Sequence, residues 1–190
     1  MFSKSELAFL TGQLGSFIEK AQSKLDGAPE NASGREGLEN NLITVVSIVN
    51  KLEHLQPESG KDKSSLKLLI VDDVKSMRDV LRHYFMALGL KNVDMAEDGH
   101  KGFLMLKNAH KHKKPYDLVV SDWEMPRMTG LELLKKVRTD SELWRTPLYL
   151  ISSLSEQQHI VKALNMGATG YLTKPVNQNM VKSKFSEYLN

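Results

Sequence analysis

Five polar side chains in the last two thirds of the chain have the types needed to bind and transfer a charged group. Each follows a short apolar run; they are Asp72, Asp73, Asp122, Ser152 and Lys174. Carboxylates that converge in one crevice repel one another, which raises the pKa of at least one unless a cation intervenes. Oxygen ligands without His or Cys suit Mg²⁺. An aspartate nucleophile, a hard cation, a hydroxyl donor and an ammonium group together indicate phosphoryl transfer to a carboxylate.

Each of these residues also has an ordinary structural explanation. An aspartate at the end of a strand is commonly a turn former or a helix N-cap, and Lys174-Pro175 suits a plain loop. The functional interpretation is favoured because all five residues fall at successive strand ends of one predicted sheet. In an open parallel sheet, ligands bind at the carboxyl ends of the strands.

The elements that position these residues begin at Leu66, where short apolar runs start to alternate with amphipathic patterns. Strands are expected at 66–71, 92–96, 118–120, 147–151 and 170–172. Helices are expected at 76–88, 99–107, 131–138, 156–165 and 178–188. This alternation predicts an α/β fold in which a doubly wound parallel sheet is covered on both faces.

Two helical patterns precede the sheet and are bounded by turn-forming segments at 27–37 and 57–65. Apolar residues recur at spacings of three and four in both patterns, namely at Leu7, Leu10, Leu14, Phe17, Ala21 and Leu25, then at Leu38, Leu42, Val45, Val49, Leu52 and Leu55. Such stripes predict an antiparallel helical hairpin over residues 1–60, followed by a second domain over 61–190. Because a two-helix hairpin buries little surface alone, its stripe should meet a second copy or the following domain.

The overall composition narrows the class of protein. The chain has 190 residues, of which 41% are hydrophobic and 26% charged, and it contains no cysteine. Disulfides and thiolate metal sites are therefore excluded. No apolar window is long enough to span a bilayer, and a net charge of +3 is too small to indicate nucleic-acid binding. We expect a cytoplasmic protein that binds no nucleic acid and does not insert into membranes.

Four segments together resemble response-regulator receiver domains. They are Ile70-Val-Asp-Asp73, Val120-Ser-Asp-Trp-Glu-Met-Pro126 with Thr129-Gly130, Ile151-Ser-Ser153, and Gly170-Tyr-Leu-Thr-Lys-Pro175. The likeness covers nearly all of residues 66–190 and is greatest to the single-domain chemotaxis type, the CheY-like receivers. It implies a flavodoxin-like (βα)₅ fold with strand order 2-1-3-4-5. It also implies a phosphoprotein of a two-component phosphorelay.

The resemblance assigns roles by position. It implies that Asp122 is the phosphoacceptor and that Asp72 and Asp73 are the acidic pair that binds Mg²⁺. The backbone carbonyl of Glu124 corresponds to a further metal ligand, and Lys174 to the lysine of the family's site.

The same resemblance implies a switch. Ser152 corresponds to the switch hydroxyl and Tyr171 to the switch aromatic residue. The output surface is then expected over residues 156–190. Glu124 and Leu154 would flank the path of the hydrolytic water, so we expect this pair to set the lifetime of the phosphorylated form.

The expected partners follow from the resemblance. A sensor histidine kinase or a phosphotransfer protein would donate the phosphoryl group. The protein would be no enzyme beyond Mg²⁺-dependent self-phosphorylation from a donor and autodephosphorylation. We expect no output domain after Lys174-Pro175, so the signal is expected to leave through a protein bound on residues 156–190 or through the hairpin.

Several alternatives stay open. The hairpin is expected to form a homodimer, but it would otherwise mask the output face of its own receiver or bind a kinase or target. The carboxylate site also suits an enzyme with an aspartyl-phosphate intermediate, such as a phosphatase for small substrates, or an adaptor whose site is vestigial.

Overall fold

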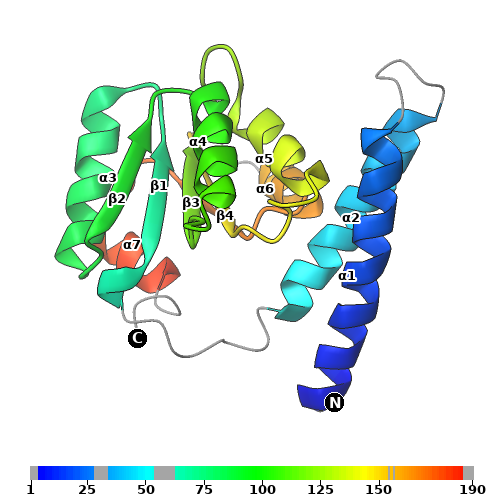
Figure 1. The fold of residues 1–190 in the computed structure, drawn as a ribbon. Helices are drawn as coiled ribbons and strands as arrows, with labels where there is room; N and C mark the ends of the chain where they lie inside the picture. The colour runs from blue at the N-terminus through cyan, green and yellow to red at the C-terminus, as the bar shows by residue number, and fades with distance from the viewer. Residues whose placement is uncertain (1–3, 28–33, 54–62, 154, 156, 186–190) are drawn as a thin grey trace.

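The computed structural model describes residues 4–27, 34–53, 63–153, 155 and 157–185. Helices α1 (Lys4–Asp26) and α2 (Arg35–Glu53) form the predicted hairpin, which stands beside a five-stranded α/β unit (Figure 1). None of the described helices has the length and apolar character needed to cross a membrane.

Five parallel strands form one sheet in the order β2-β1-β3-β4-β5. The strands are β1 (Lys67–Val71), β2 (Asn92–Ala96), β3 (Leu118–Asp122), β4 (Leu148–Ser152) and β5 (Gly170–Thr173). The connecting helices are η1 (Lys63–Ser65), α3 (Lys75–Ala87), α4 (Gly99–Lys111), α5 (Gly130–Thr139), α6 (Gln157–Asn165) and α7 (Gln178–Lys184). The predicted doubly wound, flavodoxin-like fold is confirmed, although α4 continues beyond its predicted end at Lys107.

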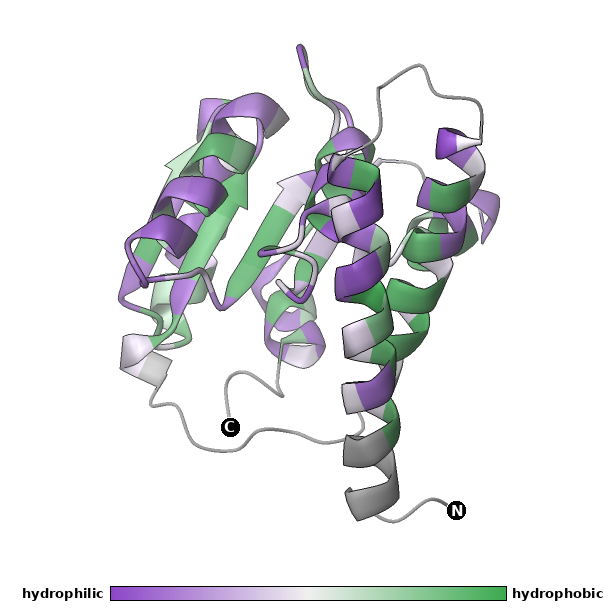
Figure 2. Cartoon of the chain, turned by 45° about the vertical axis from the view of Figure 1, so that its right-hand side comes forward, coloured by the Kyte–Doolittle hydropathy of each residue, from purple (hydrophilic) through white to green (hydrophobic). Residues whose placement is uncertain are grey.

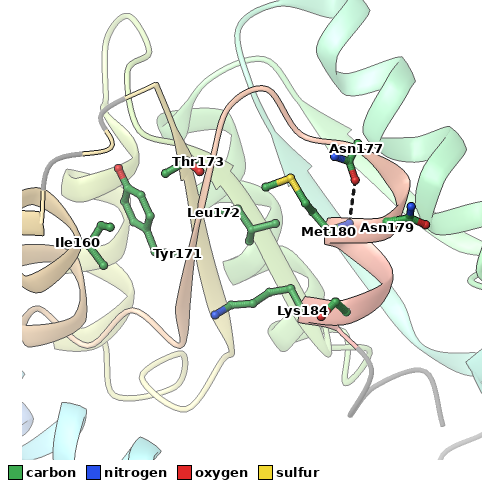
Figure 3. A pocket seen from close by; sticks show the side chains of 9 residues that line it. Ile160, Tyr171, Leu172, Thr173, Asn177, Asn179, Met180 and Lys184 are labelled. Carbon is green, nitrogen blue, oxygen red and sulfur yellow. Dashed lines mark hydrogen bonds between the residues drawn. The ribbon is translucent and has the colours of Figure 1, made fainter.

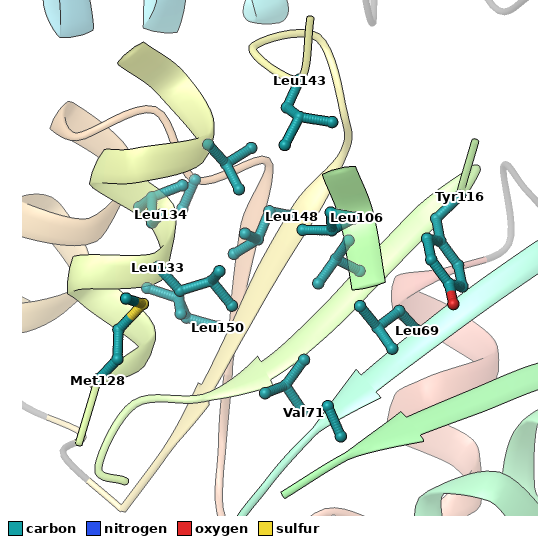
Figure 4. Close-up of a cluster of buried hydrophobic side chains, with 14 of the residues drawn as sticks. Leu69, Val71, Leu106, Tyr116, Met128, Leu133, Leu134, Leu143, Leu148 and Leu150 are labelled. Atoms are coloured by element: carbon teal, nitrogen blue, oxygen red, sulfur yellow. The ribbon is translucent and has the colours of Figure 1, made fainter. Parts of the chain in front are cut away.

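The strands are apolar along their whole length because both faces of the sheet are covered. Alternate residues point to opposite sides. On one side Leu69, Val71 and Leu150 pack with Leu106 of α4 and Leu133 of α5 (Figure 4). This side of the core therefore fixes α4, α5 and α6 over the sheet.

The other face of the sheet is covered by α3 and α7. Ile70 and Val120 pack there with Phe85 of α3 and with Val181 and Phe185 at the end of the chain described. The rings of Phe85 and Phe185 meet edge to face with centroids 5.1 Å apart. The first and last helices of the receiver unit thus share one side of the sheet.

The hairpin has its own apolar cluster, and this cluster extends into the receiver unit. Ile18 of α1 and Val46 of α2 are fully buried in it, and Trp144, which lies between α5 and β4, is buried there too. Figure 2 shows apolar stretches of both helices where they run alongside each other. The apolar stripe therefore meets the following domain, which is one of the two partners expected from the sequence.

Polar contacts accompany this packing. Gln22 Nε2 donates to the carbonyl oxygens of Arg138 and Asp140, at 3.3 and 3.1 Å. Ser47 Oγ donates to the carbonyl oxygen of Leu164 at 2.9 Å. A salt bridge joins Glu39 to Lys135 of α5 at 2.7 Å. The hairpin is thus docked on α5, on the segment after it and on α6.

Candidate functional site

The candidate site residues lie together at the carboxyl edge of the sheet. Asp72 directly follows β1, Asp122 ends the neighbouring β3, Ser152 ends β4 and Lys174 follows β5. The strand order reverses between β1 and β3, and such a switch point opens a crevice at this edge. Main-chain hydrogen bonds fix the strand ends, including Lys174 N to Ser152 O at 2.8 Å.

The Lys174 side chain joins two of the carboxylates. Its Nζ lies 3.0 Å from Asp122 Oδ1 and 3.4 Å from Asp72 Oδ2. Asp122 Oδ1 also accepts a hydrogen bond from Trp123 N at 2.9 Å. Asp122 is only 7% exposed, so this ammonium group supplies most of the compensation for a buried negative charge.

The acidic pair after β1 is held by its own loop and by α3. Asp72 is 1% exposed and accepts from Val74 N at 2.8 Å, whereas Asp73 is exposed. Arg78 Nη1 donates to the carbonyl oxygens of Asp72 and Asp73, at 2.5 and 3.1 Å. These bonds leave the Asp73 side chain open to solvent at the mouth of the crevice.

The electrostatics of the site shift two pKa values. Burial raises the pKa of Asp122; Lys174 opposes this effect, and the nearby charge of Asp72 adds to it. Burial works to lower the pKa of Lys174, but its hydrogen bond and attraction to Asp122, together with Asp72, outweigh burial and raise it. A cation placed among the carboxylates would favour their charged forms.

Three carboxylates of the site form a candidate metal centre. One oxygen atom from each of Asp72, Asp73 and Asp122 lies within 4.8 Å of the others. An all-oxygen set with one exposed member fits Mg²⁺, which retains several of its waters. The Glu124 side chain is exposed in the loop after β3. Leu154, its predicted counterpart in setting the lifetime, lies outside the described residues.

The two predicted switch residues are both buried. Ser152 is 1% exposed at the end of β4, and Tyr171 is 8% exposed on β5. The Tyr171 ring meets the edge of Trp123, with centroids 6.1 Å apart. Trp123 makes a second edge contact at 6.1 Å with His159 of α6. The residue beside the acceptor therefore touches both β5 and α6.

Several contacts that shape the site were not predicted from the sequence. Asp98 caps α4 by accepting from Lys101 N at 2.8 Å, and its other oxygen pairs with Arg127 in the loop after β3. Arg127 has a φ of 65°, in the left-handed region. Thr129 and Glu132 form a capping box at the start of α5. The Thr-x-x-Glu spacing was visible in the sequence and would have identified this cap.

The comparisons with known proteins agree with this geometry. The chain matches the family described as "Response regulator receiver domain" over residues 68–186. The chemotaxis protein CheY-3 of Vibrio cholerae serotype O1 is 37% identical over 123 residues, which are 65% of this chain and 91% of that protein. The chemotaxis protein CheY of Pseudomonas aeruginosa is 34% identical over 122 residues, or 64% and 94% of the two chains.

Solved structures show the same relationship. The chemotaxis response regulator CheY4 of Vibrio cholerae aligns with a TM-score of 0.58 at 31% identity, over 65% of this chain and 98% of that one. A CheX-CheY-BeF3-Mg²⁺ complex from Borrelia burgdorferi aligns with a TM-score of 0.58 at 27% identity, over 66% and 90% of the two chains. The hairpin lies before the matched residues. From Leu68 to Ser186, the chain belongs to the response-regulator receiver family, of the CheY-like type.

Proposed function

We propose that this protein is phosphorylated on Asp122 by a histidine kinase or phosphotransfer protein, in a Mg²⁺-dependent reaction, and that it signals through protein contacts. The observation that carries the proposal is the position of Lys174 Nζ between Asp122 and Asp72, with Asp73 completing the acidic cluster. This set combines a nucleophile, a cation site and an ammonium group at one sheet edge. The function is a two-component receiver with no other catalytic activity.

The transfer follows from the positions of these groups. An Asp122 carboxylate oxygen attacks phosphorus, the bond from phosphorus to the donor's imidazole nitrogen breaks, and the imidazole keeps that electron pair and takes up a proton. Lys174, which lies beside Asp122, would hold a phosphoryl oxygen, and the Ser152 hydroxyl would donate to another. Asp72, Asp73 and Asp122, with the Glu124 backbone carbonyl, would hold Mg²⁺. When bound, the ion would neutralise negative charge on the carboxylates and on the phosphoryl group.

The proposed output surface includes the helices and strand after β4. A hollow of about 700 Å³ lies there, lined by β5, by α7 and by Ile160 of α6. Figure 3 shows Tyr171 on one side of it and Met180 on the other. No described residue of the hairpin lines this hollow. The hollow supports the proposal that a downstream protein binds on residues 156–190. Residues 156 and 186–190 of this range lie outside the described residues.

Other expectations from the sequence belong to this proposal. The cytoplasmic location and the lack of binding to nucleic acid stay predictions. The homodimer through residues 1–60 also stays a prediction, although the hairpin makes extensive contacts with its own receiver.

The test is incubation with acetyl phosphate and Mg²⁺, with intact mass as the readout. We expect one phosphoryl adduct on the wild type and none on Asp122→Asn. Asp79→Asn, an exposed aspartate of α3, is the matched control and should behave like the wild type. Chelation of Mg²⁺ should suppress the adduct. Turnover of an unrelated phosphomonoester would instead indicate the phosphatase, and Mg²⁺ binding without an adduct would indicate the adaptor.

A further inference from the structure

The two receiver helices that contact the hairpin both follow loops that start at the site. The loop from Asp122 leads to α5, where Gly130 N donates to Trp123 O at 2.9 Å. The chain after Ser152 leads to α6. A displacement of either loop therefore acts on a helix that the hairpin touches.

The hairpin contacts α5 and α6 at their C-terminal ends, which are the ends away from the site. Gln22 Nε2 donates to the carbonyl oxygens of Arg138 and Asp140 where α5 ends, while Ser47 Oγ donates to that of Leu164 in the last turn of α6. α1 and α2 are joined by their shared apolar cluster, so these bonds act as one unit. A movement of α6 relative to α5 must break or lengthen at least one of these bonds.

The near end of α6 is linked to the acceptor through aromatic contacts. The ring of His159 packs on Trp123, the residue after Asp122, with centroids 6.1 Å apart. Trp123 also contacts Tyr171. Packed side chains of this kind have few alternative arrangements, so a local change is passed on as a shift of the element.

We propose that the hairpin is an intramolecular clamp on α5 and α6, and that hairpin docking and phosphorylation of Asp122 oppose each other. The inference rests on the proposed function. A phosphoryl group that draws Ser152 toward Asp122 pulls on the start of α6, while Ser47 holds its end. By linkage, whatever releases the hairpin favours phosphorylation, and phosphorylation weakens docking by the same factor. Such couplings are commonly about fivefold or more.

Two glycines of α1 provide a matched test in the full-length chain. A Cβ atom on Gly15 would lie 2.9 Å from Arg145 Nη2 of the receiver, whereas one on Gly12 would meet nothing within 4 Å. Gly15 is buried beside Arg145 and Trp144, so a phenyl ring there does not fit and Gly15→Phe should release the hairpin. Gly12→Phe makes the same change at an exposed position. We expect about a fivefold faster appearance of the acetyl-phosphate adduct for Gly15→Phe than for Gly12→Phe. Equal rates, or a slower rate for Gly15→Phe, would overturn the clamp.

The opposite manipulation locks the hairpin in place. Because the chain contains no cysteine, Glu39→Cys with Lys135→Cys provides a unique pair for a cleavable thiol-specific cross-linker. We expect cross-linking to slow adduct formation about fivefold and cleavage of the linker to restore it. A rate that does not respond to the linker contradicts the proposal even if Gly15→Phe fails to fold.

Docking itself is read from Trp144, one of two tryptophans and part of the hairpin cluster. With both tryptophans kept and labelled as 5-fluorotryptophan, acetyl phosphate with Mg²⁺ should increase the broadening of the Trp144 fluorine resonance by a soluble paramagnetic agent, and Asp122→Asn should abolish that response. An adduct by mass with unchanged broadening overturns the clamp alone. The absence of any adduct on the wild-type chain overturns the proposed function and the clamp together.

Discussion

At the scale of single residues, Lys174 is the counter-ion of two buried carboxylates. Among the described residues, the ion pairs of Asp72 and of Asp122 are both made with Lys174. We predict that Lys174→Ala destabilises the fold by about 2 kcal/mol without Mg²⁺, because two nearby buried charges lose their partner. Added Mg²⁺ should restore part of the lost stability. The measurement is the urea midpoint with and without Mg²⁺.

Lys162→Ala is the control for this prediction, because Lys162 is exposed on α6. Its midpoint should stay within experimental error of the wild type. An equally small change for Lys174→Ala, or a loss that Mg²⁺ leaves untouched, would contradict the role of the ammonium group as a counter-ion.

Gly130 shows how closely α5 approaches the acceptor strand. A Cβ atom at this position would lie 2.0 Å from the carbonyl oxygen of Asp122, which is main chain and cannot rotate away. We predict that Gly130→Ala costs about 2 kcal/mol or more, because α5 must shift from the sheet. Gly37→Ala in α2 should be neutral or slightly stabilising, since nothing lies within 4 Å there. Chemical unfolding of both variants checks the contrast; equal stabilities would refute it.

At the scale of elements, Asp98 joins the start of α4 to the loop after β3. Burial raises its pKa, but the Lys101 amide and the Arg127 guanidinium outweigh burial and hold the pKa of Asp98 below its usual value. A carboxyl whose pKa is lowered in the folded state stabilises the fold at pH values above its unfolded pKa of about 3.9. This contribution to stability is lost as the pH falls through the folded-state pKa.

The variant that tests this contribution is Asp98→Ala, which removes both the cap and the ion pair. We predict a loss of about 1 kcal/mol at neutral pH. The difference in stability from the wild type should narrow below about pH 4, because the unfolded chain takes up a proton on Asp98 there before the folded protein does. Thermal unfolding from pH 3 to 7 checks both parts. A gap that stays constant down to pH 3 would show that the charge of Asp98 contributes nothing.

The strands were predictable because buried parallel strands have a simple pattern. Runs such as Leu68–Val71 are apolar at every position and end at a turn, so their placement and that of Asp72 followed from the sequence. The Gly130 contact and the Asp98–Arg127 pair were not predictable in this way. They depend on distances between loops that are far apart in the chain.

The stripe predicted for α1 was partly wrong. Leu14, Ala21 and Leu25 lie in the hairpin cluster as expected, but Phe17 is 58% exposed. Polar Gln22 is fully buried instead, because it faces the main-chain carbonyl groups at the end of α5. Spacing of apolar residues cannot identify a helix side that packs through hydrogen bonds.

At the scale of the whole molecule, the hairpin has two distinct sides. One side lies on α5 and α6, and the other carries Leu10 and Phe17, which are 37% and 58% exposed. Their spacing of two helical turns places them on one face of α1. The receiver leaves this face available for a second copy of the chain. A docked hairpin and a dimer are therefore compatible in one molecule.

We predict that the homodimer expected from the sequence forms through this exposed face. The wild type should then be a dimer by size exclusion with light scattering, and Phe17→Glu should be a monomer, because a charge buried in an apolar interface costs several kcal/mol. Ser16→Glu adds the same charge at a neighbouring exposed position that lies off this face, and it should remain a dimer. If the wild type stays monomeric at every concentration, the homodimer prediction is wrong, and the hairpin contacts only its own receiver. A dimer that survives Phe17→Glu would place the interface elsewhere on the molecule.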